Sequence, residues 1–325
     1  MEYKKELLIK EKRFVGLGAI LVSIFIFPFF TERYTLQIVS FGSIFIGFLA
    51  GILSNFFVLK RRSILGDTLS HSTLTGAYFV FLLILEKNIV LLLLGALISA
   101  LLAMFLVSFL SELTELKQDT IIAVVLSIFF GLAMVFLTSI QQSGVGSQSG
   151  LSSFLVGEIT FILRRDVELI IFFTLLTLIL VVLFWKEFVL VTFDPLYAKS
   201  AGIDTKRYEI LLLVIITITI VLGVYLIGAV IIAGLMIAPS LSARQWTNNF
   251  TTTAFLGGVI GAFAGLIGSW ISANEVNTPT GPVIIIVLGI IAFLSVVFGI
   301  HNNIFLKNAK TRKLFKKILY SKQSL

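Results

Sequence analysis

Long runs of apolar residues restrict the fold of this chain more than any other feature of its sequence. Several runs hold about 18 residues or more, the length that an α-helix needs to cross about 30 Å of hydrocarbon. Hydrophobic residues make up 58% of the 325 residues and charged residues only 13%, so too little polar surface remains to cover a soluble body. The strand-like alternation of an outer-membrane barrel is missing from the sequence. We therefore predict an all-α, polytopic transmembrane helical bundle.

Nine apolar segments can be placed along the chain. They cover residues 14–30, 36–59, 64–85, 88–110, 119–139, 167–185, 209–239, 251–272 and 282–300. The N-terminal stretch and the loop from Lys60 to Ser63 are basic, whereas the loops at 31–35 and 86–88 are not. By the positive-inside rule, this pattern predicts a cytoplasmic N-terminus and places residues 185–207 on the same side.

The segment 209–239 is too long for one span and too short for two. A basic C-terminal tail on the same side as a basic N-terminus requires an even number of crossings. We therefore expect a span followed by a short or broken second element near Gly228 and Gly234, ending at Pro239. The whole chain then has about 9–10 membrane segments, which form a single transmembrane domain over residues 1–300.

The last residues, 301–325, are predicted to form a separate basic tail. The net charge is +8, and the stretch after His301 carries seven Lys or Arg and no acidic residue, so it supplies most of the excess. Apolar side chains are interleaved with these bases, a pattern that suits a cytoplasmic segment lying on anionic lipid. Membrane lipid is thus the predicted partner of the tail, rather than nucleic acid.

Two absences from the sequence limit its chemistry. The chain contains no cysteine, so any metal site has to use oxygen and imidazole nitrogen ligands. It also contains no G-x-x-x-x-G-K-[ST] motif, the glycine-rich loop that cradles nucleotide phosphates. We predict that the chain does not bind and hydrolyse ATP by itself, and that it has no ATPase site of its own.

The segment ILGDTLSHSTLTG, from Ile64 to Gly76, places two chemically active side chains within an apolar run. Asp67 and His71 are four residues apart, so on a helix they rise from one face. A carboxylate in lipid costs roughly 2.5–3.5 kcal/mol, which indicates that this face looks into protein or water. One carboxylate oxygen and one imidazole nitrogen form a partial shell for Mn²⁺, Zn²⁺ or Fe²⁺, which a second subunit could complete. Alternatively, Asp67 pairs with a nearby basic side chain and His71 hydrogen-bonds a neighbouring helix.

A third acidic residue lies in a segment of different character. Residues 151–163 are apolar but too short to span, which is typical of a re-entrant or interfacial element on the outer side. Glu158 stands in the middle of this segment. It is either a solvated loop acid or a residue that faces a water-filled path.

The stretch from Phe193 to Asp204 is predicted to form a short helix between two spans. Asp194 is a good N-cap, Pro195 suits the first helical position, and Gly202 is a natural residue just after the C-cap. A small, well-capped helix of this kind is either a handle that a soluble partner can push or an ordinary structured loop.

Gly257, Gly261 and Gly265 repeat every four residues along one predicted helix. Such a stripe lets helix backbones approach closely and indicates packing rather than a substrate site.

Five segments occur in an order and spacing that is recognisable. They read ILGDTLSHSTLTG, SSFLVGEITF, FDPLYAKSAGI, GAVIIAGLMIAPSLSAR and TPTGPVIIIV. Together they resemble the permease subunits of manganese, zinc and iron ABC importers, and the likeness runs from about Ile38 to Phe298. The G-D-x-x-S-H and F-D-P-x-x-A-x-x-x-G patterns are the most specific parts. Relatives commonly have proline before the glycine at the position of Thr75.

This resemblance implies roles for particular residues. Asp67 and His71 are implied as metal-coordinating residues of the translocation path, and Glu158 as a further residue of that path. The segment from Phe193 to Gly202 is implied as the element that docks on the ATP-binding subunit. Its matching positions are Phe193, Asp194, Pro195, Ala198 and Gly202.

The resemblance also implies an assembly in a bacterial cytoplasmic membrane. Two permeases, identical or paralogous, work with two ATP-binding subunits, which hydrolyse ATP, and an extracytoplasmic metal-binding protein feeds them. The divalent metal ion is cargo, and no cofactor is expected to be permanently bound. Two other functions stay open at this point: a proton-coupled secondary metal transporter, and a membrane enzyme that uses Asp67 and His71 as acid and base.

Overall fold

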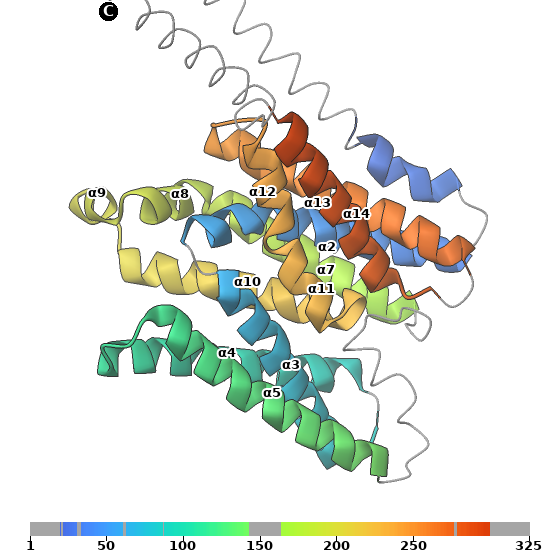
Figure 1. Ribbon diagram of the computed structural model, residues 1–325, viewed down its shortest axis with the longest axis horizontal. Helices are drawn as coiled ribbons and strands as arrows, with labels where there is room; N and C mark the ends of the chain where they lie inside the picture. The colour runs from blue at the N-terminus through green and yellow to red at the C-terminus, as the bar shows by residue number, and fades with distance from the viewer. Residues whose placement is uncertain are drawn as a thin grey trace, which may run out of the picture.

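The structure, a computed structural model, describes residues 20, 22–30, 34–60, 63–86, 88–142, 164–275 and 278–299 (Figure 1). Within these ranges every regular element is a helix. The helices are η1 (Phe27–Phe30), α2 (Tyr34–Leu59), α3 (Ser63–Ile84), α4 (Ile89–Leu113), α5 (Gln118–Gln142), α7 (Arg164–Leu183), α8 (Trp185–Phe193), α9 (Pro195–Ser200), α10 (Thr205–Ile227), α11 (Ala229–Leu235), α12 (Ala238–Arg244), α13 (Phe250–Asn274) and α14 (Thr280–Phe298). The prediction of an all-α, polytopic bundle is confirmed.

Seven of the described helices are long and apolar enough to cross a membrane: α2, α4, α5, α7, α10, α13 and α14. The 22-residue helix α3 has spanning length too. It is not one of the seven, because the polar residues between Asp67 and Thr75 lower its hydropathy. The predicted metal ligands therefore lie on a helix of spanning length that is unusually polar between Asp67 and Thr75.

The helices form two groups that lie side by side (Figure 1). One group consists of α3, α4 and α5, in which α3 packs on both of the others. The second group is built around α2 and α13, with α14 and α7 at its sides. Helices α10 and α11 join the groups, because α10 contacts α2 and α4 while α11 contacts α3.

The glycine stripe on α13 packs directly against α2. A Cβ atom added at Gly261 would meet the carbonyl oxygen of Gly47, and one added at Gly257 would meet that of Gly51. Gly265 lies equally close to the backbone of Ser43. The two backbones are therefore in contact, as the four-residue repeat predicts.

The chain after α10 is broken twice. At Gly228 the backbone has φ 105° and ψ 155°, a conformation that residues with a side chain rarely adopt, and it separates α10 from α11. The expected span and short second element are both present. The expected end at Pro239 is wrong, because Pro239 lies in the first turn of a further helix, α12. Proline is tolerated there because the first turn needs no N–H donor.

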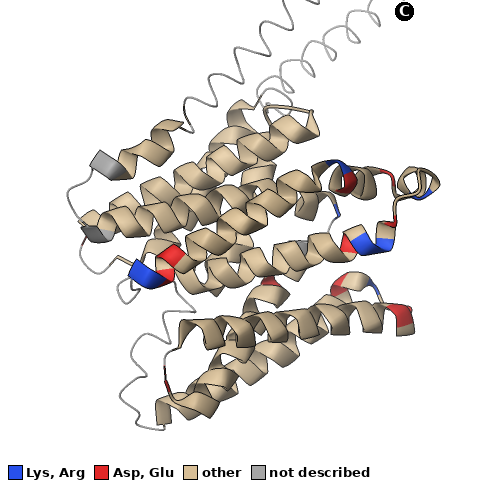
Figure 2. Ribbon diagram, turned by 180° about the vertical axis from the view of Figure 1, so that it is seen from behind, with Lys and Arg blue, Asp and Glu red and all other residues tan. Residues whose placement is uncertain are grey.

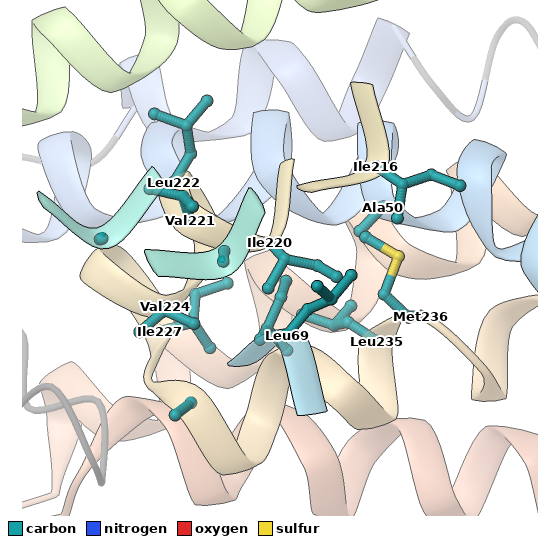
Figure 3. Packing of buried hydrophobic residues seen from close by; sticks show 14 of the residues in the cluster. Ala50, Leu69, Ile216, Ile220, Val221, Leu222, Val224, Ile227, Leu235 and Met236 are labelled. Atoms are coloured by element: carbon teal, nitrogen blue, oxygen red, sulfur yellow. The ribbon is translucent and has the colours of Figure 1, made fainter. Parts of the chain in front are cut away.

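Apolar side chains hold α3 against the joining helices (Figure 3). Leu69 of α3 is completely buried, and it lies among Ile220 and Val224 of α10, Leu235 of α11 and Met236, the C-cap residue of α11. This packing fixes one face of α3 in the core. The residues on the opposite face are left for other contacts.

Candidate functional site

Two threonines of α3 fix its position beside α5. The hydroxyl of Thr68 donates to the carbonyl oxygen of Ile122 at 3.4 Å, and that of Thr75 donates to the carbonyl oxygen of Phe129 at 2.7 Å. The donors are seven residues apart on α3 and the acceptors seven residues apart on α5, so the two helices run parallel in a defined register. Thr75 is thus an inter-helix hydrogen-bond donor, and α3 is continuous through it.

Asp67 and His71 lie on the face of α3 that the protein's own helices leave partly open. Asp67 is exposed and His71 is half-buried. The imidazole packs edge-on against the ring of Phe130, with 4.8 Å between ring centroids and an interplanar angle of 72°. The Asp67 charge is close enough to act on the imidazole, and Nδ1 of His71 has no hydrogen-bond partner in the described part of the chain.

The pair provides two metal donors and no more. Among the described residues, no group of three or more His, Asp or Glu side chains could hold a metal ion. Within the same residues, which leave out Arg61 and Arg62, no ion pair involves Asp67. A protein metal site ordinarily has at least three protein ligands, so further donors have to come from elsewhere. Glu158, the other predicted ligand, lies outside the described residues.

The neighbouring surface of α5 is also open. Ser127 and Gly131 are exposed, and a Cβ atom added at Gly131 would meet nothing within 4 Å. Phe130 of α5, whose ring contacts His71, is 40% exposed, so the open surface around Asp67 and His71 includes part of α5.

The segment predicted as a short helix folds as its caps indicate. Asp194 accepts a hydrogen bond from the Tyr197 N–H at 2.9 Å, and Pro195 occupies the first turn of α9. Gly202 has φ 82° and follows the C-cap residue. The Ile203 N–H bonds the Ala198 carbonyl at 3.0 Å, and the Gly202 N–H bonds that of Lys199 at 3.2 Å, which together form a Schellman motif.

Helix α9 protrudes at one end of the bundle (Figure 1). Ala198 is completely buried, whereas Leu196 is 82% exposed and Tyr197 59% exposed. Charged residues gather around this end, as Figure 2 shows. An exposed leucine and tyrosine on a rigid, protruding helix are typical of a contact surface for another protein.

Two polar links on α10 are not part of our sequence-based predictions. At one end, Lys60, the residue that follows α2, pairs with Glu209 at 2.9 Å. At the other end, Tyr225 donates a hydrogen bond to the buried Asp166 of α7 at 3.0 Å. The sequence gives little sign of the second link, because an acid just after basic residues at the start of an apolar run is ordinarily solvated.

These features define a polytopic membrane protein with a carboxylate and an imidazole on a partly open helix face and with a protruding, capped helix. The sequence matches the model of the ABC 3 transport family over residues 32–299. The chain belongs to this family.

Individual relatives agree with this assignment. The chain is 38% identical over 266 residues to the zinc transport system membrane protein TroC of Treponema pallidum, a match that covers 82% of this chain and 89% of the relative. It is 37% identical over 245 residues to the manganese transport system membrane protein MntC of Bacillus subtilis, covering 75% of this chain and 56% of that protein. Among solved structures, PsaBC from Streptococcus pneumoniae in complex with Fab is similar, with a TM-score of 0.73 and 26% identity over 86% of this chain and 96% of the other.

Proposed function

We propose that the chain is the membrane-spanning permease subunit of an ABC importer that moves a divalent transition metal, Mn²⁺, Zn²⁺ or Fe²⁺, into the cytoplasm. The observation that carries this proposal is the pair Asp67 and His71, displayed on the open face of α3. Oxygen and imidazole nitrogen are ligands that all three metals accept. Relatives named for manganese and for zinc transport support the same cargo class.

A second permease completes the site. Two copies that meet through the open faces of α3 and α5 bring together two carboxylates and two imidazoles, enough donors to hold the ion briefly within the membrane. Phe130, which lies beside His71 and is 40% exposed, leaves part of this face of α5 free for contact with the second copy. A binding site shared between two subunits opens readily when they rock apart, which suits a transported ion better than a permanently bound one.

In this proposal the other subunits bind at the two opposite ends of the bundle. The α9 end faces the cytoplasm and docks on ATP-binding subunits, which hydrolyse ATP, through Phe193, Asp194, Pro195, Ala198 and Gly202. An extracytoplasmic metal-binding protein delivers the ion at the opposite end of the bundle.

The proposal has three further parts, which concern Glu158, the extent of the transmembrane domain and the membrane itself. Glu158 lines the outer part of the ion path. Residues 1–300 form the single transmembrane domain, and the basic tail 301–325 lies on lipid at the cytoplasmic face. The membrane is the bacterial cytoplasmic membrane.

Transport in proteoliposomes tests the proposal. The permease, reconstituted with its ATP-binding subunits and binding protein, is expected to accumulate radioactive metal only with ATP. Asp67→Asn and His71→Ala should reduce accumulation to background while the complex still assembles. Asp119→Asn, the same change at an exposed acid of α5, should transport normally and serves as the control. Normal uptake by both site variants would refute the site, and uptake by the chain alone under a proton gradient would favour a secondary transporter.

A further inference from the structure

A cavity separate from the proposed metal site lies at the α9 end of the bundle. Its volume is about 250 Å³, somewhat below the roughly 300–1,000 Å³ of pockets that hold drug-sized ligands. It is lined by the end of α2, the last residue of α8, the end of α12 and the first turn of α13. The lining residues are Asn55, Leu59, Phe193, Arg244, Thr247, Asn248, Phe250 and Thr253.

Arg244 gives this cavity its charge. Its side chain is half-buried in the last turn of α12, and none of the residues that line the cavity is acidic. Among the described residues no ion pair involves Arg244. A guanidinium partly withdrawn from water without a counter-charge is unfavourable, and its planar fork of donors matches an oxyanion.

A buried amide adds an unsatisfied donor to the cavity wall. Asn55 of α2 is completely buried, and its Oδ1 accepts a hydrogen bond from Ser240 at 2.9 Å. Its Nδ2 is also buried and has no hydrogen-bond partner in the described part of the chain. An unsatisfied buried donor costs free energy, and a rotation of the Asn55 side chain that turned Nδ2 toward the cavity would let a ligand oxygen satisfy it.

The start of α13 adds a third source of positive potential. Phe250 and Thr253 line the cavity from the first turn of this 25-residue helix. The partial positive charge at the N-terminus of a long helix favours a bound anion. The guanidinium of Arg244, the amide donor of Asn55 and the N-terminus of α13 therefore all favour a negatively charged ligand.

We propose that this cavity binds a phosphate-class oxyanion, either inorganic phosphate or the phosphate of an anionic phospholipid headgroup, with Arg244 as its principal ligand. Bound there, the anion links α12 and the start of α13 to Phe193, the residue just before the α9 segment. This site goes beyond the proposed metal transport and does not involve Asp67 or His71.

Binding to the full chain, held with its ATP-binding subunits in phosphatidylcholine nanodiscs, tests the proposal. One arm titrates inorganic phosphate by calorimetry, and the other measures phosphatidylglycerol retained in native mass spectra of nanodiscs that contain this lipid. Wild type should bind in at least one arm, and the arm that responds identifies the source of the phosphate. Arg244→Gln should weaken that binding about tenfold or more, because it removes a charged, bidentate contact.

Two other variants make the result specific. Lys186→Gln removes an exposed cation of α8 that does not line the cavity, and its binding should equal that of wild type. Thr247→Asp places a carboxylate in the cavity wall and should abolish binding, with an unchanged melting temperature as the check on folding. Equal binding by wild type and Arg244→Gln would overturn the proposal. Absence of wild-type binding in both arms would also overturn it. Loss of the ATP-binding subunits from Arg244→Gln would then indicate that Arg244 pairs with an acidic residue of a partner.

Discussion

The hydroxyl of Thr75 lies 2.7 Å from the carbonyl oxygen of Phe129 and donates a hydrogen bond to it. The next residue on α5, Phe130, packs its ring edge-on against His71. The hydrogen bond between Thr75 and Phe129 therefore helps to set the position of the Phe130 ring, which supports the imidazole of His71, the proposed metal ligand. The geometry of the metal site depends on α5 as well as on α3.

Thr75→Val should loosen this support without changing the size of the side chain. Inter-helix hydrogen bonds in membrane proteins contribute about 0.6 kcal/mol on average and up to about 1.7 kcal/mol. We expect a small fall in melting temperature and a weakening of metal binding by a few-fold, measured by titration of the assembled complex. Thr138→Val is the matched control, because the exposed Thr138 bonds only within its own helix, to Met134 at 2.8 Å. Equal metal affinity in the two variants would contradict this account.

Gly261→Ala should destabilise the bundle, because the added methyl group would meet the backbone of Gly47. Overpacking of this kind typically costs about 1–3 kcal/mol. Gly289→Ala on α14 makes the same change where a Cβ atom meets nothing within 4 Å, so it should leave stability unchanged or slightly higher. Thermal unfolding in detergent compares the two variants, and a Gly261→Ala protein as stable as wild type would be inconsistent with backbone contact between α2 and α13.

Gly202→Ala should distort the end of α9. The φ of 82° at this position costs a residue with a side chain roughly 1–2 kcal/mol, whereas asparagine tolerates the left-handed region better. We expect Gly202→Ala to reduce co-purification of the ATP-binding subunits and metal-stimulated ATP hydrolysis. Gly202→Asn should retain most of both activities. If alanine and asparagine behave alike, the backbone conformation at this position is not what matters for docking.

Leu196→Glu should block docking on α9 more directly. Leu196 is 82% exposed, so the substitution leaves the fold intact but places a charge on the outward apolar surface. The expected result is a folded permease of normal melting temperature that no longer retains its ATP-binding subunits in size-exclusion chromatography. Leu196→Met, which keeps the apolar contact, should retain them. Retention by the glutamate variant would exclude Leu196 from the interface.

The parts of the fold that follow from local chemistry were predictable from the sequence. Asp194, Pro195 and Gly202 specify both ends of α9 through the bonds that their own backbone and side chains make. The four-residue glycine repeat likewise predicts close packing of α13. The placement of Asp67 and His71 on one face needs only the helical period.

Features that depend on distant parts of the chain could not be predicted in the same way. The hydrogen bond between Tyr225 and Asp166 joins residues 59 positions apart, and no local pattern pairs them. Pro239 was expected to end an element because its missing donor breaks a helix interior, but the same property suits the first turn where it lies. The support of His71 by Phe130 depends on how α5 packs against α3, which the periodicity of α3 alone does not specify.

The contact between α2 and α13 has a mechanical consequence. Because their main chains touch at successive turns, neither helix can roll or slide by part of a turn without forcing a side chain into the other's backbone. We therefore expect the two helices to move as one rigid unit. If the proposed transport requires the bundle to open to its two ends in turn, we expect that motion beside α2 and α13 instead, where Leu69 packs on α10 and α11 through apolar side chains.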